Sequence, residues 1–407
     1  MGQTLSEPVT EKESAHCQND ELMVGSSCMQ GYRIHMEDSH THILSLPDDP
    51  GTSFFAVYDG HGGANIGKYA SKHLHKFITK RAEYQAGDVA SAMKKAFLDI
   101  DEALLNSEEL KHEMGGSTAV VTLIKDNKLY CANAGDSRAI ACVNGQAIAL
   151  SVDHKPILPV EMQRIHESGG WVENCRVNGS LALSRALGDF KFKQNKKLKA
   201  ERQIVTAYPD VEIHDVDDKW DFILLASDGI WDVLSNDDVV KLCLKKMKDG
   251  TPPEQICEEI MTECLSPDLL MTGTDNMTIV LICFLHKKTY EDFCKRAAEY
   301  CLRLFPDDEN FQHVKSIESQ FPKCENGLST IVIPQNNEEA EESSSNSYEE
   351  QPNEKNGDDG DDKDVDKPTT DAPLENGQTN EKAPDDTNPT QESKKFKEQD
   401  TEAEDPK

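Results

Sequence analysis

Six acidic side chains lie next to apolar segments of the chain, at points where a strand would meet a loop. They are Glu37, Asp38, Asp59, Asp136, Asp228 and Asp275. Side chains at strand ends from distant parts of a chain can converge on one rim of a sheet, where carboxylates repel one another and need a cation. Hard oxygen ligands select Mg²⁺ or Mn²⁺ over Zn²⁺. Two such ions form the usual hydrolytic clamp on a phosphoryl group, so one interpretation of the pattern is a two-metal hydrolytic site.

The same residues also have a local interpretation. Asp59-Gly60 and Asp228-Gly229 are ordinary turn dipeptides. Asp275-Asn276 fits an Asx turn, and Glu37-Asp38 fits a solvated charge pair. Because a turn is the commoner use of each dipeptide taken singly, spacing alone leaves both interpretations open.

Short β-rich segments alternate with amphipathic windows of helical period between these acids. We predict strands at segments bounded by Gly, Asp or Asn: Ser53–Tyr58, Thr118–Leu123, Lys128–Ala134, Arg138–Val143, Phe222–Ala226 and Thr278–Phe284. Longer helices are predicted over Ala64–Lys80 and Ala90–Leu105. Ser235 and Thr251, each three residues before an acid, have side chains that can cap a helix start. The predicted fold class is therefore mixed α+β.

Composition excludes several kinds of protein. The 407-residue chain has 43 Lys and Arg against 75 Asp and Glu, a formal net charge of −32. This balance argues against nucleic-acid binding, which requires clustered basic side chains. The twelve cysteines include no Cys-x-x-Cys pair, and the N-terminus lacks the apolar core of a secretory signal, so we expect free thiols and a cytoplasmic location. The longest apolar segment, Met277–Leu285, is too short to span a bilayer.

The chain divides into four parts by composition. Residues 1–20 are polar, and we expect a mobile N-terminus. Residues 21–286 carry the predicted strands and most of the helices, and residues 287–335 form an extension with a helix at Tyr290–Phe305. Residues 336–407 hold 24 acidic and 8 basic residues with few apolar ones. Because so little apolar surface cannot offset the entropy of ordering, we expect an acidic, disordered tail.

Eight motifs occur in the order typical of one family. They are MQGYRIHMEDSH at Met29–His40, YDGHGG at Tyr58–Gly63, GSTA at Gly116–Ala119, GDSR at Gly135–Arg138, DHKP at Asp153–Pro156, RVNGSLALSRALGD at Arg176–Asp189, ASDGIWD at Ala226–Asp232 and DNMTI at Asp275–Ile279. Through them residues 20–286 closely resemble the catalytic domain of the type 2C metal-dependent protein serine/threonine phosphatases, nearest to their animal alpha and beta forms. The resemblance implies two packed antiparallel β-sheets flanked by helices, with a two-metal site at one end of the sandwich.

The resemblance also implies roles for the acidic residues. Asp59 resembles the carboxylate that bridges two Mg²⁺ or Mn²⁺ ions, with Glu37 and the backbone oxygen of Gly60 completing the first site. Asp228 and Asp275 resemble the ligands of the second ion. A hydroxide bridging the two ions would then attack phosphorus in line, without a covalent phosphoenzyme.

Four further residues match functional groups of the family. Asp38 resembles an acceptor that orients metal-bound water, and Arg33 resembles the arginine that binds two phosphoryl oxygens. His61 resembles the proposed general acid that protonates the leaving serine or threonine oxygen. Asp136 either resembles the ligand of a third, weaker metal or is a plain Asp in a hairpin turn, and both interpretations stay open.

Residues Arg176 to Asp189 resemble the substrate flap beside the active site, to which we assign Arg176, Asn178, Gly179 and Arg185. Asn178-Gly179 supplies a flexible turn. A basic run follows the flap, and it either attracts the acidic flanks of substrates or is a solvated loop. It consists of Lys191, Lys193, Lys196, Lys197, Lys199 and Arg202.

The N-terminal residues Met1 to Ser6 fit the M-G-x-x-x-[ST] acceptor for N-myristoylation of Gly2. One acyl chain binds membranes only reversibly, so we expect a mainly cytosolic protein that visits membranes.

The leading functional hypothesis is an active phosphoserine and phosphothreonine phosphatase, a monomer that acts on phosphorylated proteins. One alternative is a catalytically silent phosphoprotein-binding module, which would be expected to lack one or more of Asp59, Asp228 and Asp275. Another is hydrolysis of a nucleotide or other small phosphate ester, because the motifs describe the reacting phosphate and not its carrier.

Overall fold

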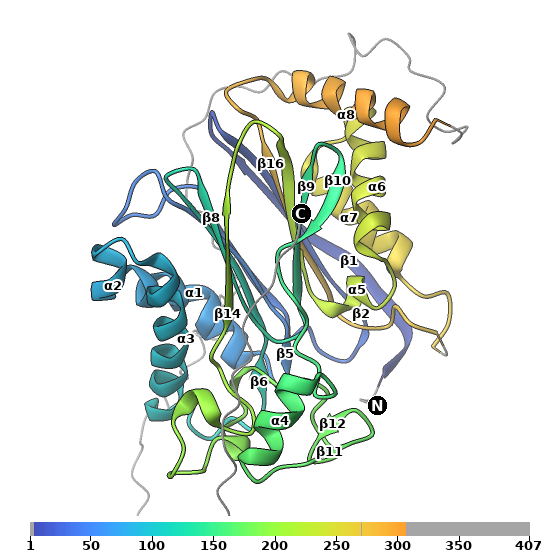
Figure 1. Cartoon of the computed structure of the whole chain (residues 1–407). Helices are drawn as coiled ribbons and strands as arrows, with labels where there is room; N and C mark the ends of the chain where they lie inside the picture. Colours follow the sequence, from blue (N-terminus) through green and yellow to red (C-terminus); the bar gives the residue numbers. More distant parts are fainter. Residues whose placement is uncertain (1–3, 270, 307–407) are drawn as a thin grey trace, which may run out of the picture. The chain divides into compact units, whose positions relative to one another are not determined.

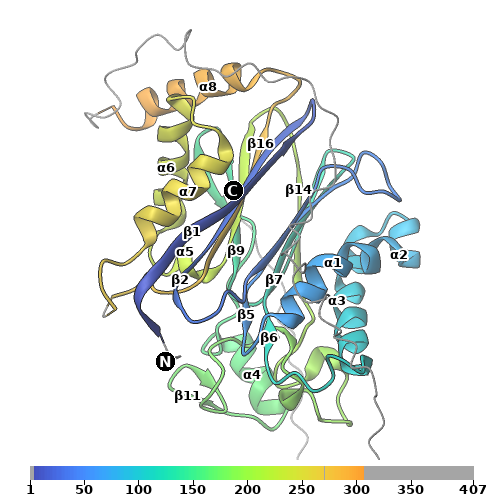
Figure 2. The ribbon, with the colours of Figure 1, turned by 180° about the vertical axis from the view of Figure 1, so that it is seen from behind.

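The computed structural model describes residues 4–269 and 271–306, which form two antiparallel β-sheets with helices on their outer faces (Figures 1 and 2). The first sheet contains β1 (Thr4–Gln18), β2 (Leu22–Arg33), β9 (Arg138–Val143), β10 (Gln146–Ala149), β15 (Trp220–Ala226) and β16 (Met277–Phe284). The second contains β3 (Ser39–Ile43), β4 (Ser53–Tyr58), β7 (Ala119–Lys125), β8 (Lys128–Ala134) and β14 (Asp210–Asp215). The strand orders are β1-β2-β16-β15-β9-β10 and β14-β8-β7-β4-β3. The predicted fold class, two packed antiparallel sheets flanked by helices, is confirmed.

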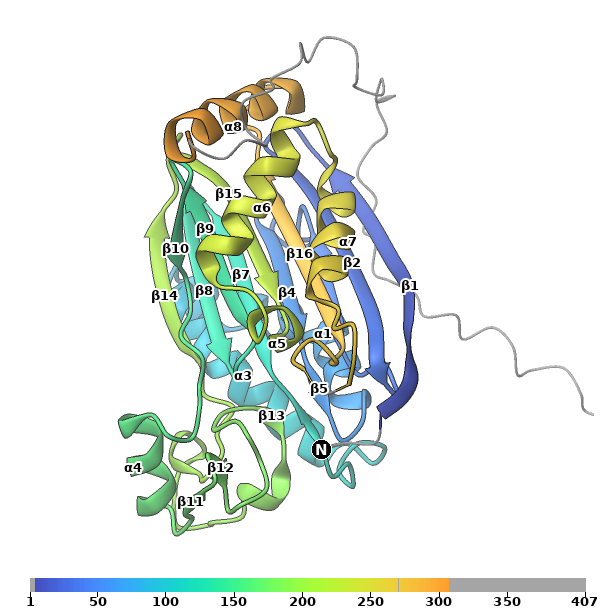
Figure 3. The ribbon, with the colours of Figure 1, turned by 90° about the vertical axis from the view of Figure 1, so that its right-hand side faces the viewer.

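Helices cover both outer faces of the sandwich. Those beside the second sheet are α1 (Asn65–Thr79), α2 (Ala82–Gln85) and α3 (Val89–Asn106). Those over the first sheet are α6 (Asn236–Lys248) and α7 (Pro253–Cys264), seen in front of it in Figure 3. At one end, top in Figure 1, lies α8 (Tyr290–Leu304). None of the helices in the described residues combines the length and apolarity needed to cross a bilayer.

Smaller elements gather at the opposite end of the sandwich, where β5, β6, β11 and β12 are labelled in Figure 1. β5 (Gly60–His61), β6 (Gly116–Ser117) and β13 (Leu187–Gly188) make a three-stranded sheet, and β11 (Val172–Glu173) pairs with β12 (Arg176–Val177). The remaining short helices are α4 (Pro159–Glu167), α5 (Asp228–Trp231), η1 (Phe190–Phe192) and η2 (Ala200–Arg202).

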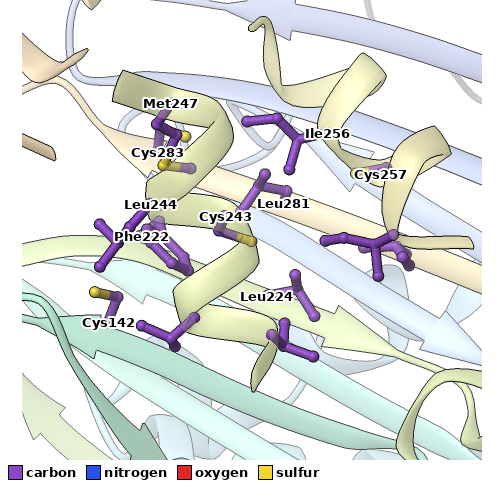
Figure 4. Packing of buried hydrophobic residues seen from close by; sticks show 14 of the residues in the cluster. Cys142, Phe222, Leu224, Cys243, Leu244, Met247, Ile256, Cys257, Leu281 and Cys283 are labelled. Atoms are coloured by element: carbon purple, nitrogen blue, oxygen red, sulfur yellow. The ribbon is translucent and has the colours of Figure 1, made fainter. Parts of the chain in front are cut away.

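The central strands β15 and β16 are apolar at nearly every position because both of their faces are buried. On β15, Phe222 and Leu224 point to the layer under α6 and α7, whereas Ile223 and Leu225 point to the second sheet. β16 alternates in the same way. Figure 4 shows the helix-side layer, in which Cys243 and other buried cysteines pack as small apolar side chains. The cysteines in the described part of the chain are free thiols.

Local sequence patterns predicted many of these elements closely. The predicted bounds of β4, β8 and β9 match the structure, and α1 and α3 begin and end within one residue of the predicted helices. Ser235 caps α6 by accepting a hydrogen bond from the Asp238 backbone N–H at 3.2 Å. The Thr251 cap was wrong, because α7 begins at Pro253 with Pro252 at the N-cap and no side-chain cap.

The expectation of a mobile N-terminus is corrected over Thr4–Gln18, where β1 pairs antiparallel with β2 along the edge of the first sheet. Residues 1–3 lie outside the described residues. The polar side chains of β1 are tolerated because most of them stay exposed or half-exposed, while the backbone groups pair with β2. The Ser14 hydroxyl also contacts β2, donating to Ser27 Oγ at 3.0 Å. Hydrophobic periodicity cannot reveal such a strand.

The C-terminal prediction is confirmed where the structure describes it. The expected helix at Tyr290–Phe305 is α8, which ends at Leu304. The rest of the extension and the acidic tail, residues 307–407, lie outside the described residues.

Gly25 on β2 is the point at which α7 approaches the first sheet. A Cβ atom there would lie 2.1 Å from the Glu254 backbone N and 2.4 Å from the Pro253 carbonyl carbon. Since backbone atoms cannot move aside as a side-chain tip can, we expect Gly25→Ala to lower the free energy of unfolding by about 1–3 kcal/mol. Urea denaturation measures this change.

The neighbouring variant Ser27→Ala is a suitable control for Gly25→Ala, because it adds no volume and removes a single hydroxyl contact on the same strand. It should lower the free energy of unfolding by about 1 kcal/mol. A Gly25→Ala protein as stable as the wild type would contradict the tight packing of α7 on β2.

Candidate active site

The predicted acids lie at strand ends from both sheets. Asp59 joins β4 to β5, Asp136 lies in the turn between β8 and β9, and Asp228 begins α5 after β15. The charges close enough to act on Asp59 are those of Asp38, Asp136, Asp228 and Asp275. Glu37 lies near His61 in the same region. The structure therefore brings the six predicted acids together at one site.

This cluster carries an excess of negative charge. Asp59 and Asp228 are partly exposed, yet protein encloses them so closely that desolvation raises the pKa of both carboxyls well above its usual value, and neighbouring carboxylates raise it further. Burial raises the pKa of Asp38 to about 7. Within the described residues, neither oxygen of this buried carboxylate makes a hydrogen bond of ordinary length. Carboxyls that oppose one another's ionisation in this way favour the binding of cations.

Two cationic side chains already engage part of the cluster. Arg33, at the end of β2, donates from Nη2 to Oδ2 of Asp275, and Lys155 donates from Nζ to Oδ2 of Asp136 at 2.5 Å. No three His, Cys, Asp or Glu side chains in the described part of the chain form a preassembled metal-binding group. The donors fit Mg²⁺ or Mn²⁺ nonetheless, since they are all oxygens and outnumber the cations.

The Asp-Gly pairs are not simple turns. Gly60 and Gly229 both have ordinary negative φ angles, so neither is needed for a left-handed conformation. A Cβ on Gly60 would lie 2.3 Å from the backbone oxygen of Glu37, and one on Gly229 would lie 2.2 Å from that of Asn276. The glycines are required because they let the acid-bearing segments touch, which favours the metal-binding interpretation over the turn.

Asn276 fixes two of these segments to each other. Its Oδ1 accepts from the Glu37 N–H at 2.9 Å, and its Nδ2 donates to the carbonyls of Gln30 at 2.8 Å and His35 at 3.1 Å. This amide therefore holds the acidic loop after β2 against the start of β16. An Asx turn, the local interpretation of Asp275-Asn276, does not account for these long-range bonds.

His61 lies on β5 and is oriented by Asp189. The imidazole Nε2 is 2.6 Å from Asp189 Oδ2, and the Asp189 carboxylate is almost fully buried. Burial alone would lower the pKa of His61, but the hydrogen bond and the charge of Asp189 outweigh it, so that the pKa is raised. The residue predicted as a general acid thus has a carboxylate partner.

Arg185, assigned to the substrate flap, has its side chain inside the protein. Its guanidinium is buried, where Nη2 donates to Glu161 Oε1 at 2.7 Å and Nη1 donates to Asp210 Oδ1 at 2.8 Å. Although burial alone would raise the pKa of Glu161, its bonds to Arg185 and Arg164 lower it to about 2. Arg185 therefore ties this part of the flap to α4 and β14.

The other flap residues lie nearer the surface. Arg176 is exposed and donates to the Ser180 carbonyl at 2.9 Å. Asn178 and Gly179 have φ angles of 49° and 70°, as a tight turn requires. The basic run beyond the flap is partly engaged within the chain, because Lys193 pairs with Asp101 and Arg202 pairs with Glu167.

Sequence reasoning missed four residues of the site: Asp189, Lys155, Asp232 and Asn276. Asp232 adds a seventh carboxylate that acts on Asp228. Each of the four lies inside one of the eight family motifs, but only the folded chain shows which side chain each one contacts.

Acidic oxygens gather at one end of the double β-sheet, with the Arg33 guanidinium and the His61 imidazole beside them, which suits metal-dependent hydrolysis of a phosphate ester. The family description "Protein phosphatase 2C" matches residues 22–269. The chain belongs to the protein phosphatase 2C family.

Similar proteins agree with this assignment. A Caenorhabditis elegans protein named as a probable protein phosphatase 2C is 52% identical over 300 residues, covering 73% of this chain and 84% of that protein. A Hypocrea jecorina protein phosphatase 2C homolog is 47% identical, covering 73% of this chain and 71% of its own. A solved phosphatase structure from Toxoplasma gondii has a TM-score of 0.59 and 26% identity, and the match covers 67% of this chain and 96% of that one.

The chain is therefore a protein serine/threonine phosphatase of a family that requires Mg²⁺ or Mn²⁺, and its substrates are phosphorylated proteins. The silent binding module, left open by the sequence, is not supported, since Asp59, Asp228 and Asp275 are all present in the cluster.

Proposed function

We propose that the chain hydrolyses phosphoserine and phosphothreonine with two divalent ions. Asp59 and Glu37, with the Gly60 carbonyl, would hold one ion, and Asp59, Asp228 and Asp275 would hold the other. When bound, the ions supply an activated water nucleophile and neutralise charge on the phosphoryl oxygens. The observation that carries this proposal is the convergence of the six acidic side chains on one end of the sandwich, where they outnumber the cations bonded to them.

Arg33 and His61 supply the remaining functions. Arg33 is half-exposed, so its guanidinium can exchange the Asp275 carboxylate for two oxygens of a phosphoryl group. His61 would donate a proton to the leaving serine or threonine oxygen, which is a poor leaving group as an alkoxide. The buried Asp38 carboxylate would accept a hydrogen bond and so orient the attacking water.

A third, weaker metal at Asp136 is part of the same proposal. Asp136 is buried and is bonded to Lys155, and its charge also acts on Asp228. An ion there would have to displace the Lys155 ammonium from Asp136, which agrees with a weaker site than the other two.

Metal removal tests the proposal directly. Release of phosphate from a phosphothreonine peptide should require Mn²⁺ or Mg²⁺ and should stop in EDTA, while circular dichroism shows that the protein stays folded. Calorimetric titration with Mn²⁺ should find two sites, plus a weaker third. Full turnover in EDTA, or a single binding site, would contradict the two-ion mechanism.

We also propose that Gly2 is myristoylated and that the protein is a cytoplasmic monomer that binds membranes reversibly. Gly2 lies outside the described residues, but Thr4 pairs in register with Arg33 at the active-site end of β2. An acyl chain two residues before Thr4 would therefore bring this end of the molecule toward the lipid.

Protein expressed in a eukaryote should carry the mass of one myristoyl group. It should also bind neutral phosphatidylcholine vesicles with an association constant of about 10⁴ M⁻¹. Gly2→Ala is the matched control and should show neither property. An unmodified Gly2 in the intact mass would remove this proposal.

A further inference from the structure

The His61 ring forms a close pair with the carboxylate of Asp189. Among the described residues, Asp189 is the hydrogen-bond partner of the His61 ring, and it contacts Nε2 at 2.6 Å. The carboxylate is 2% exposed as a side chain, whereas His61 is 28% exposed. The ring thus presents Nε2 to a buried acid and leaves Nδ1 for a group that enters the site.

Asp189 is held firmly in the geometry that this contact requires. It adopts a left-handed backbone conformation with φ 51°, and its N–H donates to the Gly115 carbonyl at 3.0 Å. Its carboxylate packs against the backbone of β6, where a Cβ on Gly116 would lie 2.5 Å from Asp189 Oδ2. Gly116 pairs in register with both His61 and Gly188, so β6 spaces the acid from the imidazole.

A second set of bonds anchors the same segment to α3. The Asp101 carboxylate accepts from the Gly188 N–H and from Lys193 Nζ, both at 2.8 Å. Lys193 Nζ also donates to the Ala186 carbonyl at 2.8 Å. The buried Asp101–Lys193 ion pair therefore holds the chain on both sides of Asp189. This ion pair does not contact His61.

We propose that Asp189 is a positioning residue which holds the His61 ring with Nδ1 directed at the leaving oxygen. This inference rests on the proposed general-acid role of His61. As the P–O bond breaks, the Nδ1–H bond would break with it, and the proton would pass to the serine or threonine oxygen. The Nε2–H group would stay hydrogen-bonded to the Asp189 carboxylate, which keeps the neutral ring in place.

Asp189→Asn tests this proposal, because an amide of the same shape can present either an oxygen or an NH₂ group to Nε2. The variant should lose about 10-fold or more in kcat on a phosphothreonine peptide. It should lose much less on p-nitrophenyl phosphate, whose leaving group needs almost no proton. In the Asp189→Asn/His61→Gln double variant, the loss on the peptide should equal that of His61→Gln alone.

Asp99→Asn is the matched control, since it removes from α3 a carboxylate that pairs with Arg81 and contacts neither Asp189 nor His61. It should leave the rates on both substrates unchanged. Equal losses from Asp189→Asn on both substrates, or an additive double variant, would overturn the positioning role. If His61→Gln itself shows equal losses, the general-acid role fails first, so the two failures are distinguishable.

A measurement on the wild-type protein keeps the test independent of variant folding. The ¹⁵N–¹H correlations of the histidine rings, assigned by the loss of one ring in His61→Gln, should show a proton on Nε2 of His61. An Nε2 without a proton would overturn the proposal even if Asp189→Asn does not fold.

Discussion

Asp228→Asn should lower kcat on a phosphothreonine peptide by about a thousandfold, even at saturating Mn²⁺. The variant removes a charged ligand from an ion that stabilises the transferring phosphoryl group, and a loss of several kcal/mol of such stabilisation corresponds to this factor. Steady-state assays across a Mn²⁺ series measure the loss and separate weak metal binding from slow chemistry. Turnover near the wild-type rate would contradict the ligand assignment.

The same variant should have an opposite effect on stability. The pKa of Asp228 is raised in the folded protein by burial and by neighbouring acids, so its ionised form destabilises the fold at pH values above the usual carboxyl pKa. In EDTA at pH 7, we therefore expect Asp228→Asn to melt at least as high as the wild type. Added Mn²⁺ should raise the melting temperature of the wild type more than that of Asp228→Asn. Asp237→Asn, at an exposed acid on α6, is the matched control and should change neither property.

His61→Gln should lower kcat by about 10²- to 10⁴-fold on phosphothreonine peptides, because the serine or threonine oxygen then leaves without a proton. On p-nitrophenyl phosphate the loss should be small. A series of phenyl phosphates with leaving groups of increasing pKa measures this difference. The kcat of the variant should fall more steeply with leaving-group pKa than the kcat of the wild type.

His112→Gln, at an exposed histidine, controls for the loss of an imidazole as such. Equal losses on alkyl and aryl phosphates in His61→Gln would exclude the general-acid role. They would leave the metal-site assignment untouched, because that assignment depends on different residues.

The buried strands and the acids at their ends could be predicted from the sequence because local patterns encode them. A strand such as β15 is apolar on both faces wherever it is placed, and its end is marked by an Asp. Edge strand β1 could not be predicted this way, because its stabilisation comes from pairing with β2 and not from a buried face of its own.

The omissions at the site share one cause, which is that a partner distant in sequence decides what a side chain contacts. Arg185 and Arg33 are both arginines inside recognised motifs. Arg185 contacts the buried Glu161, whereas Arg33 contacts the partly exposed Asp275. Asp189 ends the motif Arg176–Asp189, but its contact with a histidine 128 residues away appears only in the folded chain.

The pairing of β2 with β16 has a consequence for synthesis of the protein. Arg33 and Asp275 are 242 residues apart, and the Asn276 bond to Glu37 spans 239. At roughly 5–20 residues per second, a ribosome takes roughly 15–60 s to reach the end of β16. During that time β2 has no inner neighbour and the acidic loop has no anchor. Phosphatase activity can therefore appear only after nearly the whole catalytic domain has left the ribosome, so chains truncated before β16 should be released inactive.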